Sequence, residues 1–352
     1  MLFYFCSLVF IVSNGILYEI FYEDKVFKAF IKYELLLYLF LFSAIRFGIG
    51  IDYNNYRGIY EGINSGGVVY KYTEPLFYMF IKFCNFLRLD YKIFVLICSF
   101  FTIYFFGKSI KYIDDKYLFV YFLTYYCFCY ISSYTLIRQL LSVSITIYAW
   151  CYKDIKKRKT IILLIIACLI HKTFWIFFIL FLFSTRVKIS RKLFFFGVFI
   201  GLIILEYTSI FDSLLNYVLA SMHLVGARDY KLTRHFGLVA LLRCMYVIIY
   251  FLLLYKTNLR NSYPSLFLFT IIMFELLGTR LPIFATRMPI TFYSIYFVIY
   301  NRSVGICKLK QYSIDRLLYL TSILIMIMIF SASIIRNDNE IIPYTTIFNN
   351  KY

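Results

Sequence analysis

Residues 160–184 read "TIILLIIACLIHKTFWIFFILFLFS", an apolar stretch long enough to cross a bilayer once as a helix. Strongly basic segments flank it, KDIKKRK at 153–159 and TRVKISRK at 185–192. Basic loops are retained on the cytoplasmic side, so a single crossing would put one of them on the wrong side. We therefore predict a re-entrant pair of helices, broken at HKT (171–173). The alternative is one straight helix with His171 inside it.

The rest of the chain is also apolar. Of its 352 residues, 62% are hydrophobic, and the mean hydropathy is +0.77. We predict an all-α polytopic membrane protein with about 10 transmembrane helices, forming one integral domain over 1–352. The expected spans are 2–21, 30–47, 91–109, 117–133, 134–152, 193–211, 237–255, 263–281, 284–301 and 317–335.

Charge sets the orientation of these spans. The formal net charge of +19 lies largely in short loops between apolar runs, which indicates positive-inside bias and no nucleic-acid partner. With KDIKKRK placed in the cytoplasm, the amino terminus, loop 48–90, loop 212–236 and the carboxyl tail face outward. Within loop 48–90, the stretch 74–92 is short and broken by charge. It predicts an interfacial amphipathic helix on the outer face, or else a short tilted span.

In this topology, arginine and lysine are distributed unequally between the cytoplasmic loops and the rest of the chain. The cytoplasmic loops hold 15 Lys and 6 Arg, whereas the outward or embedded positions hold 6 Lys and 10 Arg. Guanidinium matches phosphate oxygens and tolerates partial burial. The excess therefore predicts an anionic ligand, a phosphate, at the outer side. The candidates at the ends of spans are Arg46, Arg138, Arg280 and Arg287. The alternative is that these side chains snorkel or pair with acids.

Other polar residues cluster near these arginines. The stretch RFGIGIDYNNYRGIYEG (46–62) adds Asp52, Tyr53 and Tyr56, and Asp52 would serve a hydroxyl or orient an arginine. Gln139 follows Arg138 at the head of a span. His171 is a candidate base, or a structural histidine at the helix break. Arg234 lies in a charged outward loop, 226–237, which is otherwise an ordinary solvated loop.

No metal or cofactor is expected. The chain has no Walker A motif, zinc signature or Gly-x-Ser-x-Gly elbow. The DxD-type pairing of metal-dependent sugar-nucleotide transferases is missing too.

Four motifs resemble a known family. RFGIGIDYNNY followed by EPLFYMF is similar to the R-x-G-x-G-x-D-Y-x-x-Y and E-P signature of EpsG-type Wzy proteins, which polymerise O-antigen and other exopolysaccharide repeat units. IRQLLSVSI, ACLIHKTFWI and FATRMPITFY resemble the later segments of that family, in the same order. The matching region runs from about residue 46 to 300.

The resemblance implies a GT-C-like membrane glycosyltransferase of the bacterial inner membrane, with its active site facing the periplasm. Its donor and acceptor would be oligosaccharides linked to undecaprenyl pyrophosphate, and a chain-length regulator is a further expected partner. Arginines would stabilise the leaving pyrophosphate. The substrate-binding set would comprise Arg46, Arg138, Arg280, Arg287, Gln139, Tyr53, Tyr56, Glu74 and Arg234. The base would be His171 or Asp52, and we favour His171 because imidazole titrates near neutral pH.

Two other functions compete with this one. A flippase for the same lipid-linked unit would also need arginines in a membrane cavity, although the inverted repeats typical of transporters are not visible. An O-antigen ligase would use the same donor with a different acceptor.

Overall fold

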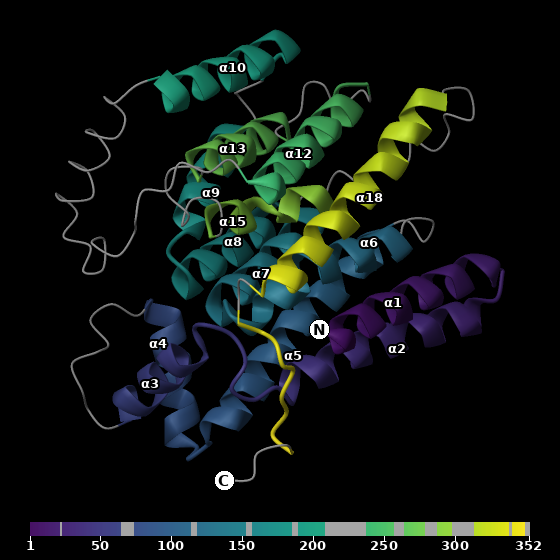
Figure 1. The fold of residues 1–352 in the computed structure, drawn as a ribbon. Coiled ribbons are helices and arrows are strands. Elements are labelled where there is room, and N and C mark those ends of the chain that lie inside the picture. Colours follow the sequence, from purple (N-terminus) through teal and green to yellow (C-terminus); the bar gives the residue numbers. More distant parts are fainter. Residues whose placement is uncertain are drawn as a thin grey trace. The chain divides into compact units, whose positions relative to one another are not determined.

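The described part of the chain is all-helical (Figure 1). The computed structural model describes residues 1–21, 23–64, 74–113, 118–152, 157–184, 189–207, 237–256, 264–278, 287–297, 313–337 and 340–348. These residues form no strand apart from an isolated bridge between Arg46 and Thr346. Among them, three helices are long and apolar enough to cross a membrane, Leu2–Ile20, Tyr91–Tyr112 and Leu317–Arg336. Shorter apolar helices accompany them, so the expected count of ten spans stays a prediction.

The chain separates into two compact units. The first comprises Met1–Phe178, Tyr296–Val304 and Phe330–Tyr352, and the second comprises Ile179–Ile295 and Gly305–Ile329. The expectation of one functional domain stays a prediction.

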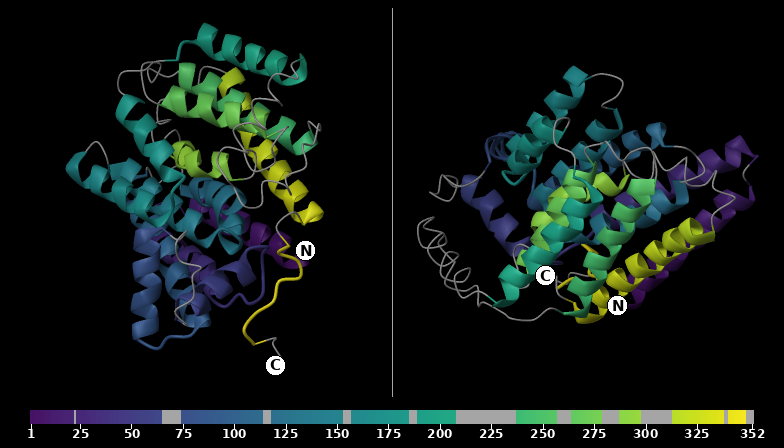
Figure 2. Two further views of the ribbon diagram at one scale, coloured as in Figure 1. Left: turned by 90° about the vertical axis from the view of Figure 1, so that its left-hand side faces the viewer. Right: turned by 90° about the horizontal axis from the view of Figure 1, so that it is seen from above.

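The first unit begins with a helical hairpin, α1 (Leu2–Ile20) and α2 (Lys25–Ala44), joined at one end (Figure 1, Figure 2). Asp24 starts α2, because its side chain accepts hydrogen bonds from Val26 N at 2.9 Å and Phe27 N at 3.0 Å. Helix α5 (Tyr91–Ser109) packs against α2. It matches the expected span 91–109.

The predicted outward loop 48–90 contains two helices. Helix α4 (Pro75–Phe86) lies inside the predicted interfacial segment 74–92 and begins with a proline, which favours the first turn of a helix. Its twelve residues extend only about 18 Å, too short for the roughly 30 Å hydrocarbon core. Helix α3 (Tyr53–Asn64) was not predicted from the sequence. It buries one stripe of side chains, Tyr53, Tyr56, Tyr60 and Ile63.

The next two expected spans, 117–133 and 134–152, are also helical. The first is α6 (Leu118–Thr124) continued by a π-helical segment, Tyr125–Tyr130, and a 3₁₀ turn, Ile131–Tyr134. The second is α7 (Ile137–Tyr152).

The stretch 160–184 is broken at HKT, as the sequence predicts. Helix α8 (Lys157–Ile170) ends immediately before it, and α9 (Phe174–Ser184) begins immediately after it. The Phe177 ring, one turn into α9, lies 5.4 Å from the Trp150 ring, close to the carboxyl end of α7. Helix α8 also contacts that end of α7. The re-entrant course of 160–184 stays a prediction.

The carboxyl tail returns to the first unit in extended conformation. Phe47 N donates to Thr345 O at 3.1 Å, and Ile347 N donates to Ile45 O at 2.9 Å. The Tyr344 ring stacks on Phe3 with centroids 3.9 Å apart. The tail, predicted to face outward, therefore lies beside the end of the predicted span 30–47.

The second unit has its own core. It contains α10 (Arg191–Tyr207), α12 (Leu238–Lys256), α13 (Pro264–Leu277), the short α15 (Met288–Phe292) and most of α18 (Ser313–Arg336). Phe194 stacks on Phe251 with ring centroids 3.6 Å apart. Of the expected span 284–301, the structure describes residues 287–297, and α15 is its first helix.

Candidate functional site

The two ends of the first unit differ in chemistry. At one end lie predicted cytoplasmic segments, where Ser109 Oγ is 2.6 Å from Tyr121 Oη and Lys159 Nζ is 3.2 Å from Tyr148 Oη. The candidate site residues described in this unit gather toward the other end, beside α3, α4 and the carboxyl tail. The sequence-based topology had assigned these two groups of segments to opposite sides of the membrane.

Helices α7 and α8 run antiparallel in a defined register. Ser142 Oγ donates to Ala167 O at 3.0 Å, and Thr160 Oγ1 donates to Ala149 O at 3.3 Å. This register places the first turn of α7 opposite the HKT break. Helix α4 contacts α8 as well, so three elements meet there.

Glu74 is the centre of that meeting point. Its side chain is 7% exposed, and one carboxylate oxygen, Oε2, accepts a hydrogen bond from Arg138 Nη1. The other oxygen, Oε1, lies 3.1 Å from His171 Nδ1 and 3.3 Å from Lys172 N. Because Glu74 is the residue before α4, its carboxylate links the start of α4 to the start of α7 and to the break between α8 and α9.

Two aromatic rings hold the Arg138 guanidinium. Its carbon lies 5.2 Å from the centroid of the Tyr56 ring and 5.5 Å from that of Phe77. Its Nε lies 3.5 Å from Tyr56 Oη. Arg138 is thus fixed by charge on one side and by stacking on the other, a geometry that lysine could not reproduce.

The electrostatics of Glu74 fix the protonation of its neighbour. Burial by itself would raise the pKa of Glu74, but the hydrogen bond with His171 and the positive charge of Arg138 outweigh it and lower the pKa to about 2. An ionised carboxylate only accepts hydrogen bonds, so His171 Nδ1 carries the proton in this contact. In the neutral ring, the lone pair is then on Nε2.

The comparison with protein families decides the identity of this chain. A model of the EpsG family matches residues 30–346. The chain belongs to the EpsG family. The resemblance found in the four motifs is confirmed, and this is a polysaccharide polymerase-type membrane protein. The comparisons with curated proteins and with solved structures give no match.

Arg46, the first arginine of the EpsG signature, has a packing role in this geometry. It is 3% exposed, and its Nη1 donates to Ser43 O at 2.5 Å and to Ser99 Oγ at 3.2 Å. Nη2 donates to Ser133 O at 3.3 Å, and the guanidinium lies over the Tyr134 ring. These bonds tie the end of α2 to α5 and to the segment before α7. They leave Arg46 less suited than Arg138 to hold a ligand phosphate.

The second glycine of the EpsG signature, Gly50, allows a close approach of two backbones. Gly50 has φ of +95°, and a Cβ on it would lie 3.0 Å from Tyr134 O and 2.9 Å from Thr135 Oγ1. Any larger residue would push the stretch 46–52 away from the segment that precedes Arg138.

The other predicted site residues lie in different parts of the chain. Tyr53 is buried against Phe47 and Tyr91, and Gln139 is 1% exposed within α7. Asp52 precedes α3, where its carboxylate accepts from Asn55 Nδ2 at 3.3 Å. Arg287 is exposed at the start of α15 in the second unit. Two of the predicted residues, Arg234 and Arg280, lie outside the described residues.

Sequence reasoning missed two contributors to the EpsG site. Phe77 follows the E-P pair by two residues and stacks on Arg138, and the backbone N–H of Lys172 binds Glu74. The adjacency of Phe77 to the E-P motif was a usable signal, whereas a backbone donor has none in the sequence. Within the described residues, no group of three or more His, Cys, Asp or Glu gathers as a metal site.

Proposed function

We propose that this EpsG-family protein polymerises oligosaccharide repeat units linked to undecaprenyl pyrophosphate. The transfer would take place at the outer face of the bacterial inner membrane, without a metal cofactor, in a GT-C-like arrangement of about ten spans. Family membership supports the polymerase class. The observation that carries the reaction is the contact of Glu74 with both Arg138 and His171.

His171 is the proposed base. The Glu74 carboxylate holds its ring through Nδ1, and Nε2 is proposed to take the proton from the acceptor hydroxyl. The acceptor oxygen then forms a bond to the anomeric carbon of the donor sugar. The bond from that carbon to the pyrophosphate oxygen breaks, and its electron pair leaves with the lipid pyrophosphate. A carboxylate that orients a histidine in this way recurs in enzymes that use histidine as a base.

Arg138 is the proposed partner of the leaving group. Negative charge grows on the pyrophosphate as the bond breaks, and a fixed guanidinium stabilises it without reorganisation. Arg287, Arg280 and Arg234 stay predicted phosphate contacts, and Tyr53, Tyr56 and Gln139, which are buried, are proposed to support the site from within the packed helices. Arg46 would act indirectly, by holding the segment before α7.

Two alternatives use the same lipid-linked substrate. A flippase needs cationic residues reachable from both sides of the membrane, and a ligase joins the chain to a lipid core. A flippase needs no histidine that is oriented by a carboxylate, so this contact favours a reaction that removes a proton over transport. A ligase also transfers sugar to a hydroxyl, and the identity of the acceptor distinguishes it from a polymerase.

The test is direct. Purified protein is incubated with synthetic undecaprenyl-pyrophosphate-linked repeat units, and the products are separated by length. A ladder of lengthened lipid-linked chains is expected from the wild type, a single unlengthened band from His171→Ala, and a normal ladder from Lys25→Gln, an exposed control. A ladder of equal yield from His171→Ala would overturn the proposed mechanism, and no ladder from the wild type would overturn the function.

A further inference from the structure

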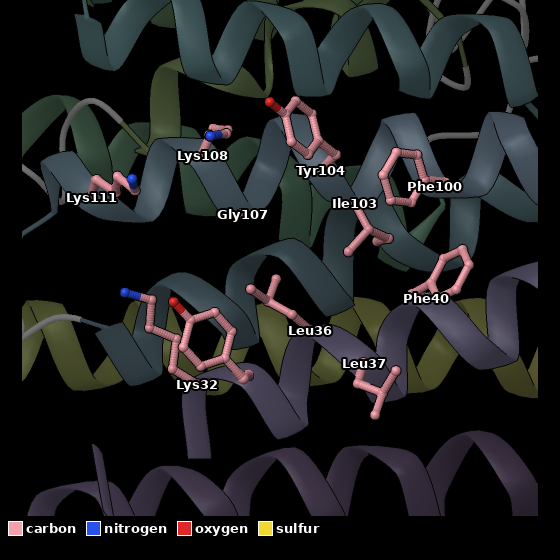
Figure 3. A pocket seen from close by; sticks show the side chains of 11 residues that line it. Lys32, Leu36, Leu37, Phe40, Phe100, Ile103, Tyr104, Gly107, Lys108 and Lys111 are labelled. Atoms are coloured by element: carbon pink, nitrogen blue, oxygen red, sulfur yellow. The ribbon is translucent and has the colours of Figure 1, made fainter. Parts of the chain in front are cut away.

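A cavity on the first unit lies far from the Glu74 site along the helices. It has a volume of about 560 Å³, within the usual range of ligand pockets, and it lies between α2 and α5 (Figure 3). Helix α2 enters it at Lys32 and reaches Phe40, whereas the Glu74 end of the unit lies beyond Ala44. The cavity is therefore separate from the proposed catalytic site.

The two ends of this cavity are chemically different. Figure 3 shows Lys32, Lys108 and Lys111 together at one end, with Phe40 and Phe100 at the other. The walls between them come from the facing helices and are aliphatic or aromatic, namely Leu36, Leu37, Ile103 and Tyr104. No acidic residue is among the described residues that line the cavity.

The lysines come from both walls and lie at the same end of the cavity (Figure 3). Lys32 belongs to the second turn of α2, Lys108 to the last turn of α5, and Lys111 to the 3₁₀ turn that follows. Lys108 Nζ lies 5.1 Å from the centroid of the Tyr104 ring, which directs its long chain along the groove. Three lysine side chains at one end of a cavity are better explained by binding of one anionic group than by each lysine reaching separately to the membrane surface.

The apolar part of the groove is open to the membrane. Leu37 is 55% exposed, Phe100 47% and Tyr104 43%, so the groove is accessible from the side. Gly107 brings the helices close at the basic end, since a Cβ there would lie 3.2 Å from Leu36 Cδ1. The groove thus combines a cationic end with a lateral apolar slot.

We propose that this α2–α5 groove binds one anionic phospholipid of the cytoplasmic leaflet. Lys32, Lys108 and Lys111 would hold its phosphate, and an acyl chain would lie along Leu37 and Phe100. Both segments that carry these lysines, 22–32 and 107–116, are predicted to be cytoplasmic. The cytoplasmic leaflet is the one rich in anionic lipids, so the basic end of the groove would lie at its headgroups. Basic pockets between membrane helices on this side are a known way of binding such headgroups.

The experiment is native mass spectrometry of the purified full chain in a non-ionic detergent. Phosphatidylglycerol and phosphatidylcholine with the same acyl chains are added separately, and bound lipid is counted. The wild type is expected to retain one phosphatidylglycerol at concentrations that load little phosphatidylcholine. Changing Lys32, Lys108 and Lys111 together to glutamine should weaken phosphatidylglycerol binding about ten-fold or more. A matched control changes Lys25, Arg191 and Lys192 to glutamine, which removes three exposed basic residues outside the groove.

Two further measurements distinguish binding through the acyl chain from binding through the headgroup alone. Leu37→Trp keeps the lysines but fills the slot, so it should also weaken retention if an acyl chain lies there. Excess sn-glycerol 1-phosphate, a headgroup without chains, should not displace the lipid. Three outcomes would overturn the proposal: equal loss in the control variant, full retention in the groove variant or in Leu37→Trp, and displacement by the free phosphate.

Discussion

At the scale of single residues, the Glu74 carboxylate contacts two groups with different tasks. Its Oε2 binds Arg138 and its Oε1 binds His171, so a single side chain sets the position of both. Removing it would leave a buried guanidinium without its counter-charge, which is costly. The arrangement makes the three residues interdependent, and substitutions should separate their roles.

The first prediction concerns the base. His171→Gln keeps a hydrogen-bonding group but cannot take a proton near neutral pH, so the transfer rate should fall roughly 10²-fold or more. Asp52→Asn should lose only a few-fold, because the Asp52 carboxylate lies beside Asn55 at the start of α3. Initial rates of purified variants on defined lipid-linked units, measured against pH, decide between them. Full activity in His171→Gln with loss in Asp52→Asn would assign the base to Asp52.

The second prediction concerns the guanidinium group of Arg138. Arg138→Lys keeps the charge but loses the stacking on Tyr56 and Phe77 and the fixed donor geometry. We expect polymer to be lost at a normal protein level, with single-unit product left. The same result is expected for Arg287→Lys. The measurement is the length distribution of polysaccharide on gels, and full-length ladders from both variants would show that these arginines only support the structure.

The third prediction follows from the low pKa of Glu74. Because its pKa is lowered from 4.5 to about 2, its ionised form stabilises the fold above about pH 4.5, and that contribution is lost as the pH falls toward 2. The Tm difference between wild type and Glu74→Gln should therefore be present above about pH 4.5 and shrink as the pH falls toward 2. Thermal unfolding in detergent, followed by circular dichroism, measures it. Glu61→Gln, which removes an exposed partner of Arg57, should show little difference at any of these pH values.

At the scale of elements, the sequence predicted those helices and breaks whose positions depend on charge and hydropathy. The break at HKT follows from two basic flanks around one apolar stretch, and α5 follows from a long apolar run. Helix α3 was missed because its apolar residues, mostly tyrosines, lie in a polar stretch of mixed composition. Its buried stripe becomes visible only when α4 and α5 pack against it.

The same limit applies to the arginines. Arg46 and Arg138 both stand at ends of predicted spans, and nothing local distinguishes them. Their roles differ because Arg46 meets Ser99 and Ser133, whereas Arg138 meets Glu74. These contacts join residues far apart in the chain, so a single sequence does not reveal them.

The fourth prediction tests whether the two helices on either side of the HKT break form the re-entrant pair that the sequence predicts. If both arms enter from the cytoplasmic side, cysteines at Arg158 and Lys192 should resist an impermeant thiol reagent in intact spheroplasts, in a background without other cysteines. These positions are exposed, so shielding by the fold does not explain protection. Asn54→Cys, exposed on α3, should be labelled as the outward control. Labelling of Lys192→Cys alone would show a simple crossing of 160–184 and contradict the re-entrant pair.

At the scale of the whole molecule, the first unit separates its chemistry along its helices. Lysines and the anionic-lipid groove lie at the end where α1 meets α2, and the Glu74 cluster lies at the end held by the carboxyl tail. A lipid-linked substrate presents its pyrophosphate at the membrane surface and its sugars beyond it. If α4 lies at the membrane interface, as the sequence predicts, the buried Glu74 carboxylate at its amino end would be suitably placed to meet both parts.

The fifth prediction follows from that placement and separates the three candidate functions in the producing bacterium. In a strain whose only copy is His171→Ala, a polymerase defect should leave single repeat units at the cell surface, because export and ligation still proceed. A flippase defect would instead trap lipid-linked units inside, where an external glycosidase cannot reach them, and a ligase defect would leave no sugar on the lipid core. The measurement is polysaccharide length and glycosidase accessibility in cells with equal protein levels. Complementation with Lys25→Gln should restore the full ladder, because that residue is exposed at the opposite end of the unit. Trapped units in the His171→Ala strain would instead show that the Glu74 cluster serves transport, because units that remain inside have not been carried across the membrane.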